Sequence, residues 1–274
     1  MVARHIRGRA WVRAVTLATL IAALPACRRK HIPVASVPEI PYPTCNGAPI
    51  PATGELVVSG SMRAGPTSLD PNVVERYEIR HRGCVYVASI RQEWPLGTAD
   101  AEVVFDEQWL PLRAWRRTTI PGSRRADGNA DIRRYELRTP EVTVKRRAPE
   151  GVSYEIIRGG HPRAVVGPGR GLITAWIHRA HLREGERSRE VVLDFREVVE
   201  RVQEVTLRRE PDMFVDWLGR NARVYTIYGR EPIFTDEHDN VIGDLSGMRP
   251  AALVTTPAPP AVPMYGTPDP VGTP

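Results

Sequence analysis

Two histidines with a nearby glutamate are the residues of this chain whose spacing suggests metal chemistry. His178 and His181 lie three residues apart, and Glu184 follows three residues later. Imidazoles at positions i and i+3 of a helix can share one zinc ion, and His161 could add a third nitrogen. The spacing is not the HExxH pattern, and no cysteine cluster accompanies it. We therefore interpret these histidines as the polar flank of a half-buried helix and predict no metal site.

A second cluster, Asp236-Glu237-His238-Asp239-Asn240, concentrates oxygen ligands in five residues. A calcium loop also needs a glycine bend and a distal bidentate glutamate, and Gly243 and Asp244 do not fit that spacing. Because Asp and Asn tolerate turn geometry, we interpret the cluster as the tip of a hairpin.

The chain carries no serine in a G-x-S-x-G elbow and no P-loop. The glycine-rich segment Gly167-Pro168-Gly169-Arg170-Gly171 is a poor phosphate cradle, because Pro168 lacks a backbone donor. We interpret it as a flexible lead-in to a helix. The sequence thus predicts no catalytic residue and no cofactor, and a metal-dependent envelope enzyme is the least favoured alternative.

Residues 113–147 are strongly basic, with 11 Arg and Lys against Asp127, Asp131, Glu136 and Glu141. In antiparallel strands we expect these cations to fall largely on an outer face and at loop tips. A solvated face explains the excess, but contact with lipid phosphates or another anionic envelope polymer would also use it, because the arginine fork suits phosphate. The candidate contacts are Arg116, Arg117, Arg124, Arg125, Arg133 and Arg134.

The amino terminus has the zones of a secretion signal. Four arginines precede an uncharged run, Ala14–Leu24, which is too short to span a bilayer. The run ends in Leu24-Pro25-Ala26-Cys27, which resembles the lipobox of bacterial lipoproteins. The resemblance implies acylation of Cys27 after cleavage before it, and hence a partner in membrane lipid. The alternative is an ordinary cleaved signal with a coincidental cysteine.

The compartment follows from this anchor. Arg28 is not the Asp associated with inner-membrane retention, so we expect an outer-membrane protein that faces the periplasm. The formal charge of +6 is largely due to the signal: without its four arginines, 38 basic residues become 34, against 32 acidic ones. A nearly neutral exported chain is a poor candidate for binding nucleic acid.

Cys45 and Cys84 remain once Cys27 is lipidated. An oxidising periplasm favours a disulfide between them, and two unpaired thiols are the alternative.

Composition and periodicity predict four segments: a lipoprotein signal at 1–26, an anchor with a proline-rich tether at 27–53, a β domain at 54–248 and a disordered Pro/Thr-rich tail at 249–274. The domain alternates with period two over about ten short segments, which predicts a mainly β fold with a large antiparallel meander. Its shape is left open between a half-barrel, an open curved sheet and a packed sandwich. One helix is predicted at 172–184, from the apolar stripe of Ile173, Trp176, Ile177 and Ala180, with Gly185 as its terminator. Residues 212–218 are a weaker candidate for a helical turn.

The layout resembles certain uncharacterised periplasmic bacterial proteins, half-barrels similar to the lipoprotein-carrier chaperone fold. The residues that carry the resemblance are Trp109–Arg113, Leu182–Gly185 and Pro232–Asp236. It implies an open, curved sheet whose apolar concave face suits an acyl chain or a hydrophobic peptide, with no catalytic residue.

The sequence therefore suggests a non-enzymatic lipoprotein that binds a hydrophobic or anionic envelope component. The candidate ligand-lining residues are Ile173, Trp176 and Ile177, although core packing would also use them. A structural or assembly lipoprotein without a small ligand is the main alternative.

Overall fold

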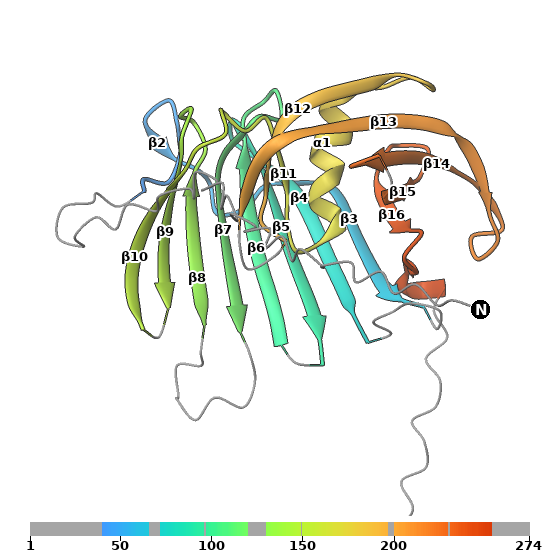
Figure 1. Ribbon diagram of the computed structural model, residues 1–274, viewed down its shortest axis with the longest axis horizontal. Coiled ribbons are helices and arrows are strands. Elements are labelled where there is room, and N and C mark those ends of the chain that lie inside the picture. Colours follow the sequence, from blue (N-terminus) through green and yellow to red (C-terminus); the bar gives the residue numbers. More distant parts are fainter. Residues whose placement is uncertain are drawn as a thin grey trace, which may run out of the picture.

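The computed structural model describes residues 40–65, 72–95, 97–119, 130–148, 150–196, 200–229 and 231–253. Over these ranges the protein is mainly β, with a large antiparallel meander, a curled half-barrel and one helical segment (Figure 1). The predicted fold class is confirmed.

The meander is a nine-stranded antiparallel sheet in the order β10-β9-β8-β7-β6-β5-β4-β3-β17. Successive strands from β3 to β10 are neighbours in the sheet, and β17 returns from the end of the described chain to pair with β3. The strands are β3 (Glu55–Ala64), β4 (Val74–Arg82), β5 (Val85–Trp94), β6 (Gly97–Phe105), β7 (Pro111–Thr119), β8 (Asp131–Glu136), β9 (Val142–Ala148), β10 (Gly151–Ile157) and β17 (Met248–Pro250).

The half-barrel is a six-stranded sheet in the order β11-β12-β13-β14-β15-β16. Its first pair is parallel and the others are antiparallel. The strands are β11 (Ala164–Val166), β12 (Arg187–Asp194), β13 (Arg201–Val215), β14 (Arg220–Ile227), β15 (Glu231–Thr235) and β16 (Val241–Asp244). β13 continues through residues 212–215 and a turn follows at 216–219, so the helical turn expected there is wrong.

The helical segment lies between the two sheets (Figure 1). It consists of a 3-10 turn η2 (Arg170–Leu172) followed by α1 (Ile173–Ala180). The predicted end at residue 184 is four residues late. His181 adopts the left-handed conformation (φ 44°) while its N–H still donates to the Ile177 carbonyl, and this closes the helix earlier than Gly185.

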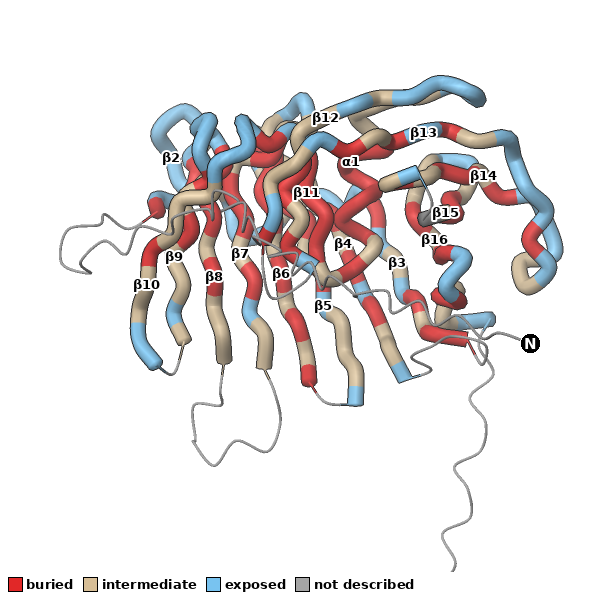
Figure 2. The backbone as a smooth tube through the Cα atoms, in the orientation of Figure 1, coloured by how far each residue is buried: buried red, intermediate tan, exposed pale blue. Residues whose placement is uncertain are grey.

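The core forms because each strand of the meander alternates between two faces (Figure 2). We call the face toward α1 the inner face and the opposite one the outer face. On β4, Tyr77 and Ile79 are buried on the inner face, whereas Arg76 is exposed on the outer face. Inner-face residues such as Val103 join Leu193 of β12 and Trp176 of α1 in one apolar cluster.

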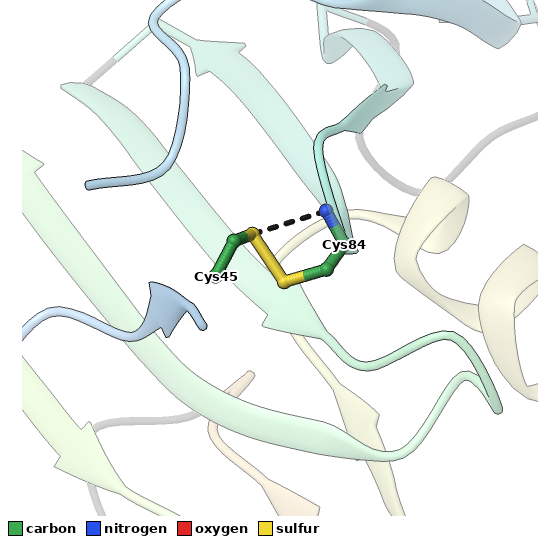
Figure 3. Close-up of a disulfide and its surroundings, with 2 residues drawn as sticks. All are labelled: Cys45 and Cys84. Atoms are coloured by element: carbon green, nitrogen blue, oxygen red, sulfur yellow. Dashed lines mark hydrogen bonds between the residues drawn. A yellow bond between two sulfur atoms is a disulfide. The ribbon is translucent and has the colours of Figure 1, made fainter. Parts of the chain in front are cut away.

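The segment before β3 is attached to this body. It contains a small hairpin, β1 (Thr44–Cys45) and β2 (Ala48–Pro49), and Cys45 forms a disulfide with Cys84 in the β4–β5 turn, with 5.5 Å between the Cα atoms (Figure 3). The predicted bridge is confirmed. Residues 40–53 of the predicted tether therefore belong to the folded structure. The predicted tail begins as β17 and a 3-10 turn, η3 (Ala251–Leu253).

Several predictions fall outside the described residues. These are the signal and Cys27, the tether before Ile40 and the tail after Leu253. No helix in the described part of the chain is long and apolar enough to cross a bilayer.

Candidate functional site

A cavity of about 500 Å³ opens where η2 and the start of α1 meet the half-barrel. Apolar side chains from separate segments form its walls, namely Val166, Ile173, Ile227 and Ile233. Polar groups gather elsewhere on its lining, from Gln92, Arg170, Arg196, Asp244 and Ser246. The cavity is therefore amphipathic, with apolar walls and several charged and polar lining residues.

Arg170 ties the glycine-rich loop to the β16–β17 turn across this cavity. Its guanidinium pairs with Asp244 and donates to the Ser246 hydroxyl at 3.2 Å. Asp244 also accepts from the Ser246 hydroxyl at 2.7 Å and from the Met248 N–H at 3.1 Å. The aspartate is thus fully engaged in holding the turn, and Arg170 is the residue that joins the two loops.

Glu75 lies beneath the glycine-rich loop and is fully buried. One of its oxygens accepts from the Gly171 N–H at 2.8 Å, while the other is 3.8 Å from Arg170 and has no hydrogen-bond partner among the described residues. Burial raises the pKa of Glu75 above its ordinary value, and the nearby Arg170 charge offsets only part of this effect. The carboxylate anchors the loop at an electrostatic cost.

The loop itself was expected to be a flexible lead-in, but its glycines serve close packing. A Cβ at Gly169 would collide with the Ile90 side chain, and a Cβ at Gly171 would collide with the Tyr77 ring. Tyr77 in turn donates to the Val241 carbonyl at 2.8 Å, and Thr174 accepts from the Val241 N–H at 3.2 Å. These contacts join β4, the helix and β16 beside the cavity.

The three predicted ligand-lining residues divide in two. Ile173, the first residue of α1, lines the cavity. Trp176 and Ile177 lie one turn further along, where they are almost fully buried in the main apolar cluster and do not line it. The same stripe thus serves the cavity at one end and the core at the other.

The six arginines predicted to contact anions also differ in where they lie. Arg117 and Arg134 are on outer-face positions of β7 and β8, and Arg124 and Arg125 lie outside the described residues. Arg116 and Arg133, expected on the outer face, are instead buried on the inner face.

A buried polar network explains the placement of these two arginines. Arg116 donates to the Phe195 carbonyl, and Arg133 pairs with Asp131 at 2.8 Å and with Glu200. The Tyr135 hydroxyl donates to Glu200 at 2.9 Å. Carbonyl and carboxylate partners from the half-barrel therefore permit these cations to be buried between the sheets.

The histidines do not converge. His161 and His181 are exposed, whereas His178 is partly buried and packs edge-on against the Trp109 ring, with 5.5 Å between ring centres. No group of three His, Cys, Asp or Glu within metal reach occurs among the described residues.

Residues 236–240 form the turn between β15 and β16. One oxygen of Asp236 accepts from the N–H groups of His238 and Asn240, each at 2.9 Å. Asp106 does the same at the β6–β7 turn, where it accepts from Gln108 and Leu110. The third residue after each aspartate, Asp239 or Trp109, is left-handed. The carboxylate oxygens of Asp236 therefore accept hydrogen bonds within the hairpin turn itself.

Sequence reasoning missed the polar groups at the cavity. Glu75 was detectable, because alternation places it on the same face as Tyr77 and Ile79, and a carboxylate on a buried face is unusual. Asp244, Ser246 and Gln92 carry no such signal, since only the tertiary fold brings them together.

The fold and this cavity define a mainly β protein whose curled half-barrel and meander enclose one helical segment beside an amphipathic cavity. No protein-family model matches the chain, and no curated protein matches it. It has a distant structural likeness to a crystal structure of a DUF1089 family protein from Pseudomonas aeruginosa. That match has a TM-score of 0.41 and 14% sequence identity, and covers 61% of this chain and 87% of the other.

Proposed function

We propose that this chain is a non-enzymatic, lipid-anchored protein of the bacterial envelope that binds a hydrophobic ligand in the cavity beside α1. The cavity carries the proposal. Its volume of about 500 Å³ lies within the range of small-molecule sites, roughly 300–1,000 Å³. Apolar walls combined with a few polar lining groups favour an amphipathic molecule such as a lipid, whose chain would contact Ile173, Ile227 and Ile233.

The ligand is tested by native mass spectrometry of residues 28–274, exported behind a cleavable secretion signal so that no anchor lipid is present. We expect a co-purified lipid mass. Ile173→Trp, which fills the cavity, should remove that mass. The same substitution at half-buried Ile156 on β10, outside the cavity, should leave it in place.

A protein that carries no bound lipid, and that acquires none from vesicles of envelope phospholipids, would contradict ligand binding. That result would favour the alternative of a structural or assembly lipoprotein. Retention of the lipid by Ile173→Trp would show that the lipid binds outside this cavity and would contradict the proposed site.

The anchor is a separate part of the proposal, and it rests on Leu24-Pro25-Ala26-Cys27. Radiolabelled palmitate should enter the full-length protein, and Cys27→Ala should abolish the label. The paired substitution of Cys45 and Cys84 by alanine removes the other cysteines and should retain it. Unlabelled wild-type protein, or intact protein in the cytosol, would refute the anchor and the outer-membrane location.

A further inference from the structure

The outer face of the nine-stranded sheet carries two aligned rows of side chains. Strand register places outward residues of neighbouring strands opposite one another, about 4.8 Å apart. The first row runs from β3 to β9 through Ser59, Glu78, Ser89, Glu102, Trp115, Arg134 and Lys145. The second row runs through Ser61, Arg76, Arg91, Asp100, Arg117, Ile132 and Arg147.

Over β3–β7 these rows line an open groove of about 660 Å³. Three serines, Ser59, Ser61 and Ser89, contribute hydroxyls to it. Both acids and bases lie among them, as in Arg91, whose Nη1 lies 3.5 Å from Asp100. Donors and acceptors side by side can satisfy both directions of a hydroxyl's hydrogen bonding. The half-buried Trp115 ring, at the end of the groove, offers an apolar face of the kind on which a sugar ring can stack.

Beyond Trp115 the same face becomes basic. Its outward residues on β7–β9 include Arg117, Arg134, Lys145 and Arg147, whereas the acid among them, Glu136, pairs with Arg138 at 2.7 Å. Arg117 and Arg147 are exposed and lie two strands apart, which is about 10 Å. That distance is comparable to the length of a disaccharide unit.

The combination distinguishes between two anionic partners. A membrane surface would meet the carboxylates Glu78, Asp100 and Glu102 together with the cations, and their repulsion would weaken docking. The hydroxyls of a sugar chain can donate hydrogen bonds to these carboxylates, and the acidic groups of the chain can contact the cations. We propose that the outer face binds an acidic polysaccharide, with a sugar ring on Trp115 and anionic groups at Arg117 and Arg147.

This inference goes beyond the proposed function and rests on it only for the envelope location, not for the cavity. The test uses the exported chain of residues 28–274 with an immobilised polyuronate as the acidic polysaccharide and neutral dextran as the uncharged control. We expect binding to the polyuronate and none to dextran. Arg117→Gln with Arg147→Gln should weaken binding roughly tenfold or more, since both charge-assisted contacts are lost.

Arg183→Gln with Arg187→Gln is the matched control, because both residues are exposed and lie outside these rows. It should bind like the wild type, and Trp115→Ala should weaken binding at constant charge. An equal loss of affinity in the two arginine double variants would mean unspecific charge attraction and would overturn the proposal. Unchanged binding by Trp115→Ala, in a protein with native circular dichroism, would overturn it as well. Binding to phosphatidylglycerol vesicles but not to the polyuronate would overturn the proposal and identify a membrane surface instead. The lipid-mass assay is independent of all these outcomes.

Discussion

The carboxyl of Glu75 holds the glycine-rich loop beside the cavity, and its burial lowers the stability of the folded protein. Its carboxyl is buried, one oxygen accepts from the Gly171 N–H, and the other has no hydrogen-bond partner among the described residues. A buried charge with incomplete partners is unfavourable, so the folded state binds the proton more tightly than the unfolded chain does. Stability from this group is therefore greatest below pH 4.5 and is lost as the pH rises through the raised pKa.

Glu75→Gln should remove this dependence while keeping an oxygen for Gly171. Between pH 4.5 and 8, we expect the midpoint of thermal unfolding of the variant to rise relative to that of the wild type. Glu78→Gln on the outer face is the control: hydrogen bonding from Arg80 lowers the pKa of Glu78, so its linked change in stability falls mainly below pH 4.5 and its relative midpoint should vary little over this range. Parallel pH profiles for wild type and Glu75→Gln would contradict this account.

Glu200 completes the network that permits buried arginines between the sheets. Its side chain is 2% exposed and pairs with Arg133, which is 6% exposed. Glu200→Gln should lower the free energy of unfolding by about 3 kcal/mol, because the buried guanidinium of Arg133 loses a charged partner while its pair with Asp131 remains. Glu204→Gln should change it by less than about 1 kcal/mol, since its pair with Arg189 is exposed. Urea unfolding measures both, and similar small effects would show that the network carries little energy.

The helix is held at its carboxyl end between elements of both sheets. The His178 ring contacts Trp109 of the β6–β7 turn and lies near Asp239 of the β15–β16 turn. The two turns share one construction, in which an aspartate caps the backbone of the following residues. A pair of similar turns therefore flanks the last turn of α1, whose end is set by the left-handed His181.

Burial lowers the pKa of His178, although the nearby Asp239 opposes the shift. The unfolded chain then binds the proton more readily, so stability is retained above pH 6.5 and lost as the pH falls through the lowered pKa. His178→Gln should flatten the unfolding free energy between pH 5 and 7, whereas His161→Gln, at an exposed position, should not. A profile unchanged by His178→Gln would show that the imidazole does not titrate within the fold.

The strands and the helix were predictable to different degrees. Alternation identified most strands, because one face of each, such as Tyr77 and Ile79 on β4, is buried. It did not identify β11 or β17, which are three residues long and gain their pairing from β12 and β3. The helix was found from its stripe, but its end depends on the left-handed His181, which no propensity indicates.

At the scale of the molecule, the two sheets share one core. The main apolar cluster includes Ile79 and Val103 of the meander, Trp176 of α1, and Leu193 and Leu207 of the half-barrel. A common core favours a single cooperative unfolding unit.

Leu193→Ala tests this. It should cost about 2–5 kcal/mol, and amide hydrogen exchange should accelerate equally in β12 and in the distant β5. Ile242→Ala, at the half-buried edge of a separate small cluster, should have a much weaker effect on β5. Acceleration confined to the half-barrel would mean that the sheets open independently.

The sequence predicted the broad architecture and the disulfide but not the cavity. Periodicity reports which face a residue occupies on its own strand, not what lies opposite it. Arg116 and Arg133 illustrate this limit, because their buried positions depend on partners from a sheet that follows them in the chain. Ile173 was found because it belongs to the helix stripe, whereas Arg170 and Asp244 are brought together only by the fold.

The Cys45–Cys84 bond has a mechanical consequence. Any pull that reaches the body from its amino-terminal side arrives at Cys45 and crosses through the covalent bond to the β4–β5 turn. β3 lies inside the closed loop and is bypassed, so tension cannot peel it from its neighbour one hydrogen bond at a time. A domain tethered to a surface through its amino-terminal end would resist unfolding under force while the disulfide is intact, and would lose this resistance under reducing conditions.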